Sequence, residues 1–130
     1  MDQKPLILLV DDEPEMLKLY KRKLEKSGFD VITAENGLLG VEAAKGARRP
    51  DLVLMDIKMP LMNGIEAFEK IKEDPATKDM KIILLTAFSD LAIPEVDTKT
   101  AAELGAIDFI KKGIDLDAFV DRVKLGLGKK

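Results

Sequence analysis

A short apolar run that stops at a carboxylate constrains this chain more than any other feature. The run covers residues 52–55, and Asp56 follows it directly. Strands buried on both faces, as in a parallel sheet, are short continuous apolar runs. Ligands of open α/β sheets bind outside the carboxyl ends of the strands, which would place Asp56 where such a fold performs its chemistry. The plainer alternative is that Asp56 only ends a strand or forms a turn, as aspartate often does.

Four further segments have strand character, and segments with helical spacing separate them. We expect strands over 5–10, 29–34, 81–86 and 106–110, and helices over 15–27, 38–44, 65–74, 101–104 and 116–127. Residues 87–100 contain Pro94 and several acidic residues, and indicate a loop or an interrupted helix start. Each connection is long enough for a right-handed parallel crossover. The pattern predicts a doubly wound (βα)5 three-layer α/β sandwich with a parallel five-stranded sheet.

The composition excludes several classes of chemistry. The 130 residues suit one domain, and a net charge of −3 does not suggest a nucleic-acid or lipid surface. The chain has no cysteine and no histidine, so it lacks thiol chemistry, the commonest general base and the ligands of softer metals. No apolar run is long enough to span a membrane, and no signal-peptide pattern is present. We therefore expect a cytoplasmic protein, with no membrane partner and no direct nucleic acid binding.

Polar side chains end the expected strands, and a parallel sheet would gather them at one edge. They are Asp11, Asp12, Asp56, Thr86, and Lys111 or Lys112. Crowded carboxylates repel one another, and a hard cation such as Mg²⁺, which prefers oxygen ligands, relieves that repulsion. A hydroxyl and an ammonium suit a phosphoryl group, and an aspartate can act as its nucleophile. The set predicts phosphoryl transfer to Asp56. Taken singly, the acids could be helix caps and the lysines a solvated pair.

Four segments follow one another along the chain: "LILLVDDEP", "DLVLMDIKMPLMNG", "IILLTA" and "GAIDFIKK". In this order, and over the whole chain, they resemble the receiver domain of two-component response regulators. The resemblance implies a flavodoxin-like fold with strand order 2-1-3-4-5, with Asp56 as phosphoryl acceptor and Gly64 as the family's loop glycine. It further implies Mg²⁺ bound by Asp11, Asp12, Asp56 and the backbone carbonyl of Lys58. Thr86 would be the switch hydroxyl, Phe109 the aromatic side chain that moves with it, and Lys112 the phosphate-binding lysine.

Two features of the sequence depart from the family pattern, one residue and the length of one segment. The lysine after the fifth strand is usually followed by proline, but aligning Phe109 with the family aromatic puts Gly113 there. That alignment selects Lys112, with Lys111 as the neighbour that could be mistaken for it. The chain between Thr86 and Lys112 also looks a few residues longer than usual, around residues 89–98. An altered partner surface or a mobile fourth helix would follow from that extra length.

The resemblance also implies a signalling cycle. A histidine kinase or a histidine phosphotransfer protein would donate the phosphoryl group to Asp56 in a self-catalysed reaction, followed by slow autodephosphorylation. A downstream protein would dock on the face formed by the fourth helix, fifth strand and fifth helix. Lys58 and Phe88 occupy the positions that tune hydrolysis, and their bulk predicts a long-lived phosphoryl group. We expect one receiver domain over 1–130, ordered over about 5–127, without an output domain.

Two other functions remain open on the sequence. One is a receiver-fold docking module that works without phosphorylation, although the acids, hydroxyl and lysine argue against it. The other is a phosphatase or nucleotide enzyme on a similar sheet. Against that reading, no glycine-rich phosphate loop follows the first strand, where Asp11, Asp12 and Glu13 stand instead.

Overall fold

A parallel five-stranded sheet organises the structure, a computed structural model that describes residues 3–86 and 105–128. The strands are β1 (Leu6–Val10), β2 (Asp30–Ala34), β3 (Leu52–Asp56), β4 (Ile82–Thr86) and β5 (Asp108–Lys111). Their order across the sheet is β2-β1-β3-β4-β5, and every neighbouring pair is parallel. The predicted fold class and strand order are confirmed.

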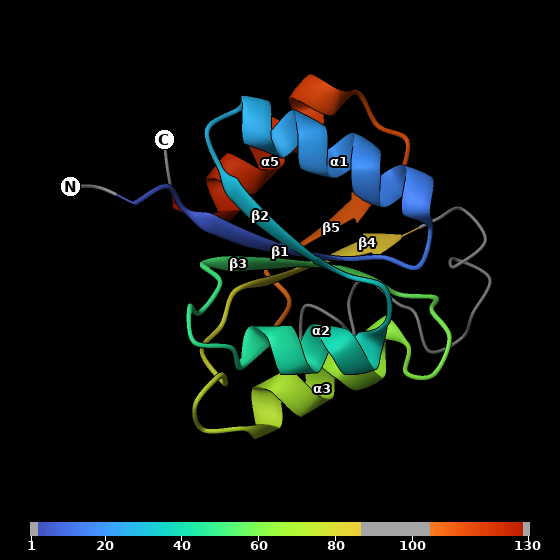
Figure 1. Cartoon of the computed structure of the whole chain (residues 1–130), viewed down its shortest axis with the longest axis vertical. Helices are drawn as coiled ribbons and strands as arrows, with labels where there is room; N and C mark the ends of the chain where they lie inside the picture. Colours follow the sequence, from blue (N-terminus) through green and yellow to red (C-terminus); the bar gives the residue numbers. More distant parts are fainter. Residues whose placement is uncertain (1–2, 87–104, 129–130) are drawn as a thin grey trace.

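Helices cover both faces of this sheet (Figure 1). The helices α1 (Pro14–Lys26) and α5 (Leu116–Gly126) lie on one face, and α2 (Gly37–Ala44) and α3 (Gly64–Glu73) lie on the other. Two apolar clusters fill the layers between sheet and helices, one containing Tyr20 and Phe119 and the other containing Phe68. The helix expected over 101–104 and the ambiguous segment 87–100 lie outside the described residues.

The central strands are apolar on both sides because both sides are covered. Every residue of β1, β3 and β4 is buried, whereas the edge strand β2 buries only Ala34 fully. The register pairs Val10 with Met55, so that the residues after them, Asp11 and Asp56, emerge side by side. The sheet therefore converts the ends of separate apolar runs into one cluster of polar groups.

The fifth strand begins and ends later than the sequence predicts. The structure gives Asp108–Lys111 rather than 106–110, although the Ile107 N–H still donates to the Ile82 carbonyl at 3.0 Å. The strand is also held from outside the sheet. The Arg122 side chain on α5 donates to both carboxylate oxygens of Asp108 and, at 2.8 Å, to the Phe109 carbonyl. Side-chain hydrogen bonds of this kind leave no periodic signal in the sequence.

Local residues explain where the helices near the site begin. Pro14 occupies the first turn of α1, where the N–H that proline lacks has no partner in any helix. Asn36 caps α2 by accepting the Leu39 N–H at 2.8 Å. Asn63 and Glu66 form a reciprocal capping box at the start of α3. In the described part of the chain, no helix is long and apolar enough to cross a membrane.

Candidate functional site

Three predicted site residues meet at the carboxyl edge of the sheet. Asp11 follows β1, Asp56 ends β3 and Lys112 follows β5. The Lys112 ammonium lies 2.8 Å from Asp11 Oδ2 and 3.1 Å from Asp56 Oδ1. All three side chains are nearly inaccessible to solvent: 8% exposed for Lys112, 0% for Asp11 and 3% for Asp56. Their charges therefore interact in a poorly solvated space, where such interactions are stronger than at the surface.

The two carboxylate oxygens of Asp11 have different partners. Its Oδ1 accepts the backbone N–H of Glu13 at 2.9 Å. Its Oδ2 is buried, forms an ion pair with the Lys112 ammonium at 2.8 Å and accepts no further hydrogen bond. Buried carboxylate oxygens with so few partners are uncommon. The oxygen can therefore also serve as a metal ligand.

Crowding shifts the pKa values of the site residues. Burial raises the pKa of Asp56, the negative charge of Asp11 raises it further, and the Lys112 ammonium opposes both, with a result of about 7. For Lys112, burial alone would lower the pKa. The contacts with Asp11 and Glu13 and the charge of Asp56 outweigh burial, and its pKa is raised. Lys112 is therefore firmly cationic, and the carboxylates carry more negative charge than it neutralises.

The carboxylate cluster has the donors that a hard divalent cation requires. Oxygen atoms of Asp11, Asp12, Glu13 and Asp56 all lie within 4.8 Å of one another. One ammonium cannot balance four carboxylates, and Asp11 Oδ2 is buried with no partner besides that ammonium. Mg²⁺ favours carboxylate oxygens together with water. The residues present therefore fit Mg²⁺, and Asp12, which is exposed, leaves the site open on one side.

Glu13 belongs to this cluster although the sequence analysis did not assign it to the site. Its Oε1 accepts a hydrogen bond from Lys112 at 2.9 Å, and its side chain is 58% exposed. The sequence offered one signal, since Glu13 follows Asp11 and Asp12 directly. Glu13 also holds the N-cap position of α1.

The loop between β3 and α3 is closed by two glycines. The Gly64 N–H donates to the Ile57 carbonyl at 2.7 Å, and a Cβ at Gly64 would lie 2.1 Å from the Asp56 carbonyl oxygen. A Cβ at Gly37, the first residue of α2, would lie 2.2 Å from the Met62 carbonyl oxygen. Both glycines allow an approach that no other residue permits. The loop that follows Asp56 is thus packed against the first turns of two helices.

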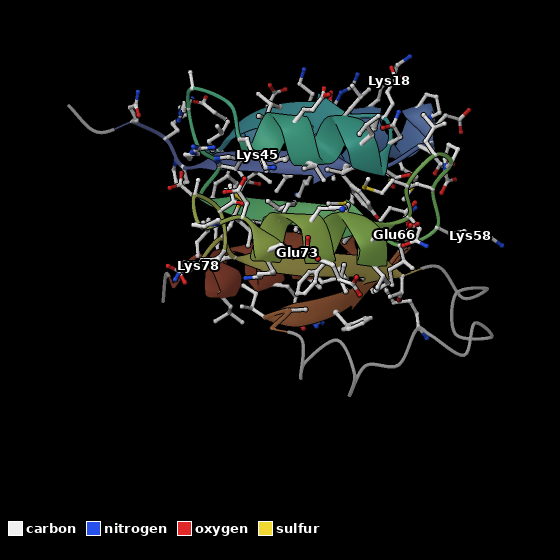
Figure 2. All side chains as sticks on the ribbon, turned by 90° about the horizontal axis from the view of Figure 1, so that it is seen from below. Lys18, Lys45, Lys58, Glu66, Glu73 and Lys78 are labelled. Atoms are coloured by element: carbon white, nitrogen blue, oxygen red, sulfur yellow. The ribbon has the colours of Figure 1, made fainter. Side chains whose placement is uncertain are left out.

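The remaining predicted residues lie around this centre. Lys58 is in the loop after Asp56, and its side chain points away from the body of the protein (Figure 2). Thr86 is buried at the end of β4, and its carbonyl accepts the Lys112 N–H at 2.8 Å. Phe109 on β5 is half-buried against the cluster that contains Phe68. Phe88 lies outside the described residues.

The two adjacent lysines point to different surroundings. Lys112 makes the contacts with Asp11, Glu13 and Asp56, whereas Lys111 is exposed at the end of β5. The structure therefore places the Lys112 ammonium, and not that of Lys111, beside Asp11 and Asp56.

The geometry agrees with what is known of related sequences. The profile of the response regulator receiver domain matches residues 7–124, which is most of the chain. The chain belongs to the response regulator receiver domain family. It shares the flavodoxin-like fold of that family, whose members generally bind Mg²⁺ and interact with histidine kinases or phosphotransfer proteins.

Two relatives match over nearly their whole length. Protein PilH of Pseudomonas aeruginosa is 38% identical over 117 residues, which cover 90% of this chain and 93% of PilH. The polar-differentiation response regulator DivK of Brucella anthropi is 31% identical over 122 residues, covering 94% and 95%. Other relatives are longer, and the chain spans 48% of one and 26% of another.

Solved structures show the same architecture. The crystal structure of a putative response regulator from Chloroflexus aurantiacus superposes with a TM-score of 0.85 at 25% identity. The match covers 98% of this chain and 100% of that one. The fold is therefore the same as that of an experimentally determined structure.

Proposed function

We propose that this protein accepts a phosphoryl group on Asp56 from a phosphohistidine of a sensor kinase or histidine phosphotransfer protein. One observation carries the proposal: a buried Asp56 carboxylate lies 3.1 Å from the Lys112 ammonium, beside an acidic cluster suited to Mg²⁺. A nucleophile, a fixed cation and a set of metal-binding oxygens are together what phosphoryl transfer to a carboxylate requires.

The transfer makes one bond and breaks one bond. An Asp56 oxygen forms the new O–P bond while the N–P bond of the donor histidine breaks, and its electron pair returns to the imidazole nitrogen. Lys112 stabilises the charge on the phosphoryl oxygens, because its ammonium is already held next to the acceptor. Burial of Asp11 and Asp56 removes competing water from one side of the acceptor.

The metal would be held by Asp11, Asp12 and Asp56, with the Lys58 carbonyl as a further ligand. When bound, Mg²⁺ supplies positive charge that offsets the crowded carboxylates and the incoming phosphoryl group. Asp11 is the best-placed of these residues, because its Oδ2 is buried and has no partner besides the Lys112 ammonium. Glu13 can release Lys112 toward the phosphoryl group, since it is a solvent-exposed partner.

The proposed output is a change of surface. Thr86 would move toward the phosphoryl group and Phe109 would turn inward, shifting the equilibrium between two states of the face around β5 and α5. A downstream protein would read that face. Lys58 and Phe88 would slow hydrolysis by hindering water, and Phe88→Glu would then shorten the life of the phosphoryl group. We propose that the chain acts as one receiver domain and works in the cytoplasm.

The test is the intact mass of the protein after incubation with a small acyl phosphate and Mg²⁺. We expect one added phosphoryl group on the wild type, none on Asp56→Asn, and none on the wild type when a chelator is present. A folded wild type that binds Mg²⁺ but gains no mass would instead favour a docking module that never takes phosphate. In that case partner binding would be the same for wild type and Asp56→Asn.

A further inference from the structure

The turn that carries Lys112 has an unusual backbone. Gly113 has a φ of +90°, a region that residues with a side chain rarely adopt and that proline cannot reach. One strong backbone bond fixes the start of the turn, the Lys112 N–H to the Thr86 carbonyl at 2.8 Å. The next, from the Ile114 N–H to the Lys111 carbonyl, is long at 3.4 Å. Beyond Lys112, the hydrogen bonds of the turn are long, and the one that Gly113 donates is also 3.4 Å.

The side chain of Tyr20 reaches this turn from α1. Its ring is 2% exposed and stacks on Phe119 of α5, with centroids 4.4 Å apart and an interplanar angle of 20°. Its hydroxyl oxygen accepts the Gly113 N–H at 3.4 Å. The stacked ring has one orientation, so the hydroxyl is presented to the turn by a rigid support that spans two helices.

The charges of the site act on the same hydroxyl. Burial raises the pKa of Tyr20, the Gly113 N–H and the Lys112 ammonium lower it, and Asp11 and Glu13 raise it slightly. The Tyr20 hydroxyl is thus close enough to Lys112, Asp11 and Glu13 for their charges to affect its pKa. As an apolar contact of α1 alone, Tyr20 could be replaced by leucine, which has no hydroxyl to place near the turn.

Gly113 is suited to the contact with Tyr20 in two ways. The family pattern usually has proline at this position, and proline has no N–H to donate. Glycine provides the N–H and also tolerates the φ of +90° that directs it to Tyr20. Glycine in place of proline at position 113 therefore allows the contact with the buried Tyr20 hydroxyl.

We propose that Tyr20 is a positioning residue that holds the Lys112–Gly113 turn, and through it the Lys112 ammonium, at the acceptor. This inference rests on the proposed phosphoryl transfer to Asp56. Tyr20 does not touch the acceptor. It acts by restricting the backbone next to Lys112, whose ammonium has to stay within reach of Asp56 Oδ1.

The test compares Tyr20→Phe with a matched loss of a buried hydroxyl elsewhere. Tyr20→Phe keeps the ring and its stacking on Phe119 and removes only the acceptor. Thr77→Val removes a buried hydroxyl that donates to the Ile71 carbonyl at 2.7 Å, at a position outside the site. Three quantities are measured for each protein: the phosphorylation rate at saturating acyl phosphate, the dissociation constant of Mg²⁺ and the melting temperature.

We expect Tyr20→Phe to lower the saturating rate by about twofold to threefold, the effect of one long hydrogen bond. The Mg²⁺ dissociation constant should not change, and melting should fall no further than in Thr77→Val. Thr77→Val should keep the wild-type rate. In the metal-free protein, the Gly113 amide proton should shift upfield and exchange faster in Tyr20→Phe, and in Thr77→Val it should not.

Each contrary result has its own meaning. An unchanged rate in Tyr20→Phe, or an unchanged Gly113 amide, overturns the positioning role while the proposed function stands. A rate that falls equally in both variants assigns Tyr20 to general stability and also overturns it. Failure of the proposed function itself appears in the wild type, as the absence of any Asp56-dependent gain in mass.

Discussion

Lys112 Nζ lies 3.1 Å from Asp56 Oδ1 although the two residues come from strands that are not neighbours. β4 separates β3 from β5, so Lys112 has to reach across the end of β4. Its backbone N–H is fixed to the last residue of β4, at the Thr86 carbonyl. The position of the ammonium therefore depends on three strands and on the turn that follows β5.

Single substitutions should show that Lys112 and Lys111 have different roles. We expect Lys112→Ala to slow phosphorylation of Asp56 by about 100-fold or more, because a fixed cation at the developing charge is lost. Lys111→Ala should stay near the wild-type rate, since Lys111 is exposed and outside the cluster. The rates come from intact mass at timed intervals with a small acyl phosphate. Equal loss in both variants would contradict the assignment.

Asp11 should matter for metal binding more than an exposed acid nearby. We expect Asp11→Asn to weaken Mg²⁺ binding by at least about tenfold, or about 1.4 kcal/mol, because a buried charged ligand becomes neutral. Glu15→Gln in the first turn of α1 is the control and should bind normally. Calorimetric titration with Mg²⁺ measures both. An Asp11→Asn protein with wild-type affinity would remove Asp11 from the metal site.

A substitution at Gly37 should be destabilising because the new side chain would collide with Met62, and not because of the backbone conformation of Gly37. A Cβ there would lie 2.2 Å from the Met62 carbonyl oxygen, so Gly37→Ala should lower the free energy of unfolding by about 1–3 kcal/mol and displace the loop after Asp56. It should also weaken Mg²⁺ binding. Denaturant unfolding and Mg²⁺ titration are the measurements.

Gly28→Ala is the matched control for Gly37→Ala. Gly28 has a φ of +99° with nothing within 4 Å of its Cβ position. Its substitution should destabilise by about 1–2 kcal/mol through backbone strain alone and leave Mg²⁺ affinity unchanged. If both variants bound Mg²⁺ equally well, the packing of α2 on the loop would have no role in the site.

The Asp108–Arg122 pair should give a pH-dependent contribution to stability. Burial alone would raise the pKa of Asp108, but hydrogen bonds from Arg122 and the Phe109 N–H, with the Arg122 charge, leave it below its ordinary value. Such a carboxyl stabilises the folded state above the unfolded pKa, and this stabilisation is lost as the pH falls through the folded pKa. At neutral pH we expect Asp108→Asn to cost about 0.5–1 kcal/mol, because Arg122 is partly exposed.

Urea unfolding from neutral pH down to about pH 3 measures the difference between wild type and Asp108→Asn. The difference should be constant above about pH 5 and shrink below about pH 4. Asp121→Asn, an exposed acid on the same helix, is the control and should show little difference at any pH. A difference that grows on acidification would have the wrong sign for this pair.

The fold was predictable because its strongest signals are local. The continuous apolar runs of β1, β3 and β4 are buried on both faces, and no exposed face interrupts them. The ends of these runs placed Asp11 and Asp56 at one edge before any contact was known. The limits of β5 were less clear, because Arg122 and the Ile107 N–H hold its start through contacts far apart in the sequence.

The parts of the site that the sequence did not predict are contacts between distant residues. Locally, Glu13 is the N-cap residue of α1 and Tyr20 is a buried apolar contact of the same helix. Their reach to Lys112 and Gly113 depends on how α1 lies against the end of β5. The Lys112 assignment could be made only because the aromatic residue Phe109 fixed the alignment. Spacing alone would have left Lys111 equally plausible.

Arg122 also determines how a signal could travel through β5. By holding the Phe109 carbonyl at 2.8 Å and the neighbouring Asp108 carboxylate, it fastens the strand backbone to α5 on both sides of the Phe109 Cα. A change in the χ1 angle of Phe109 would therefore not require the backbone of β5 to move. In the proposed signalling cycle, activation would then change the rotamer of Phe109 and would not displace the strand. Side-chain carbon shifts of Phe109 would record it, and a comparison of Cα traces at β5 would not.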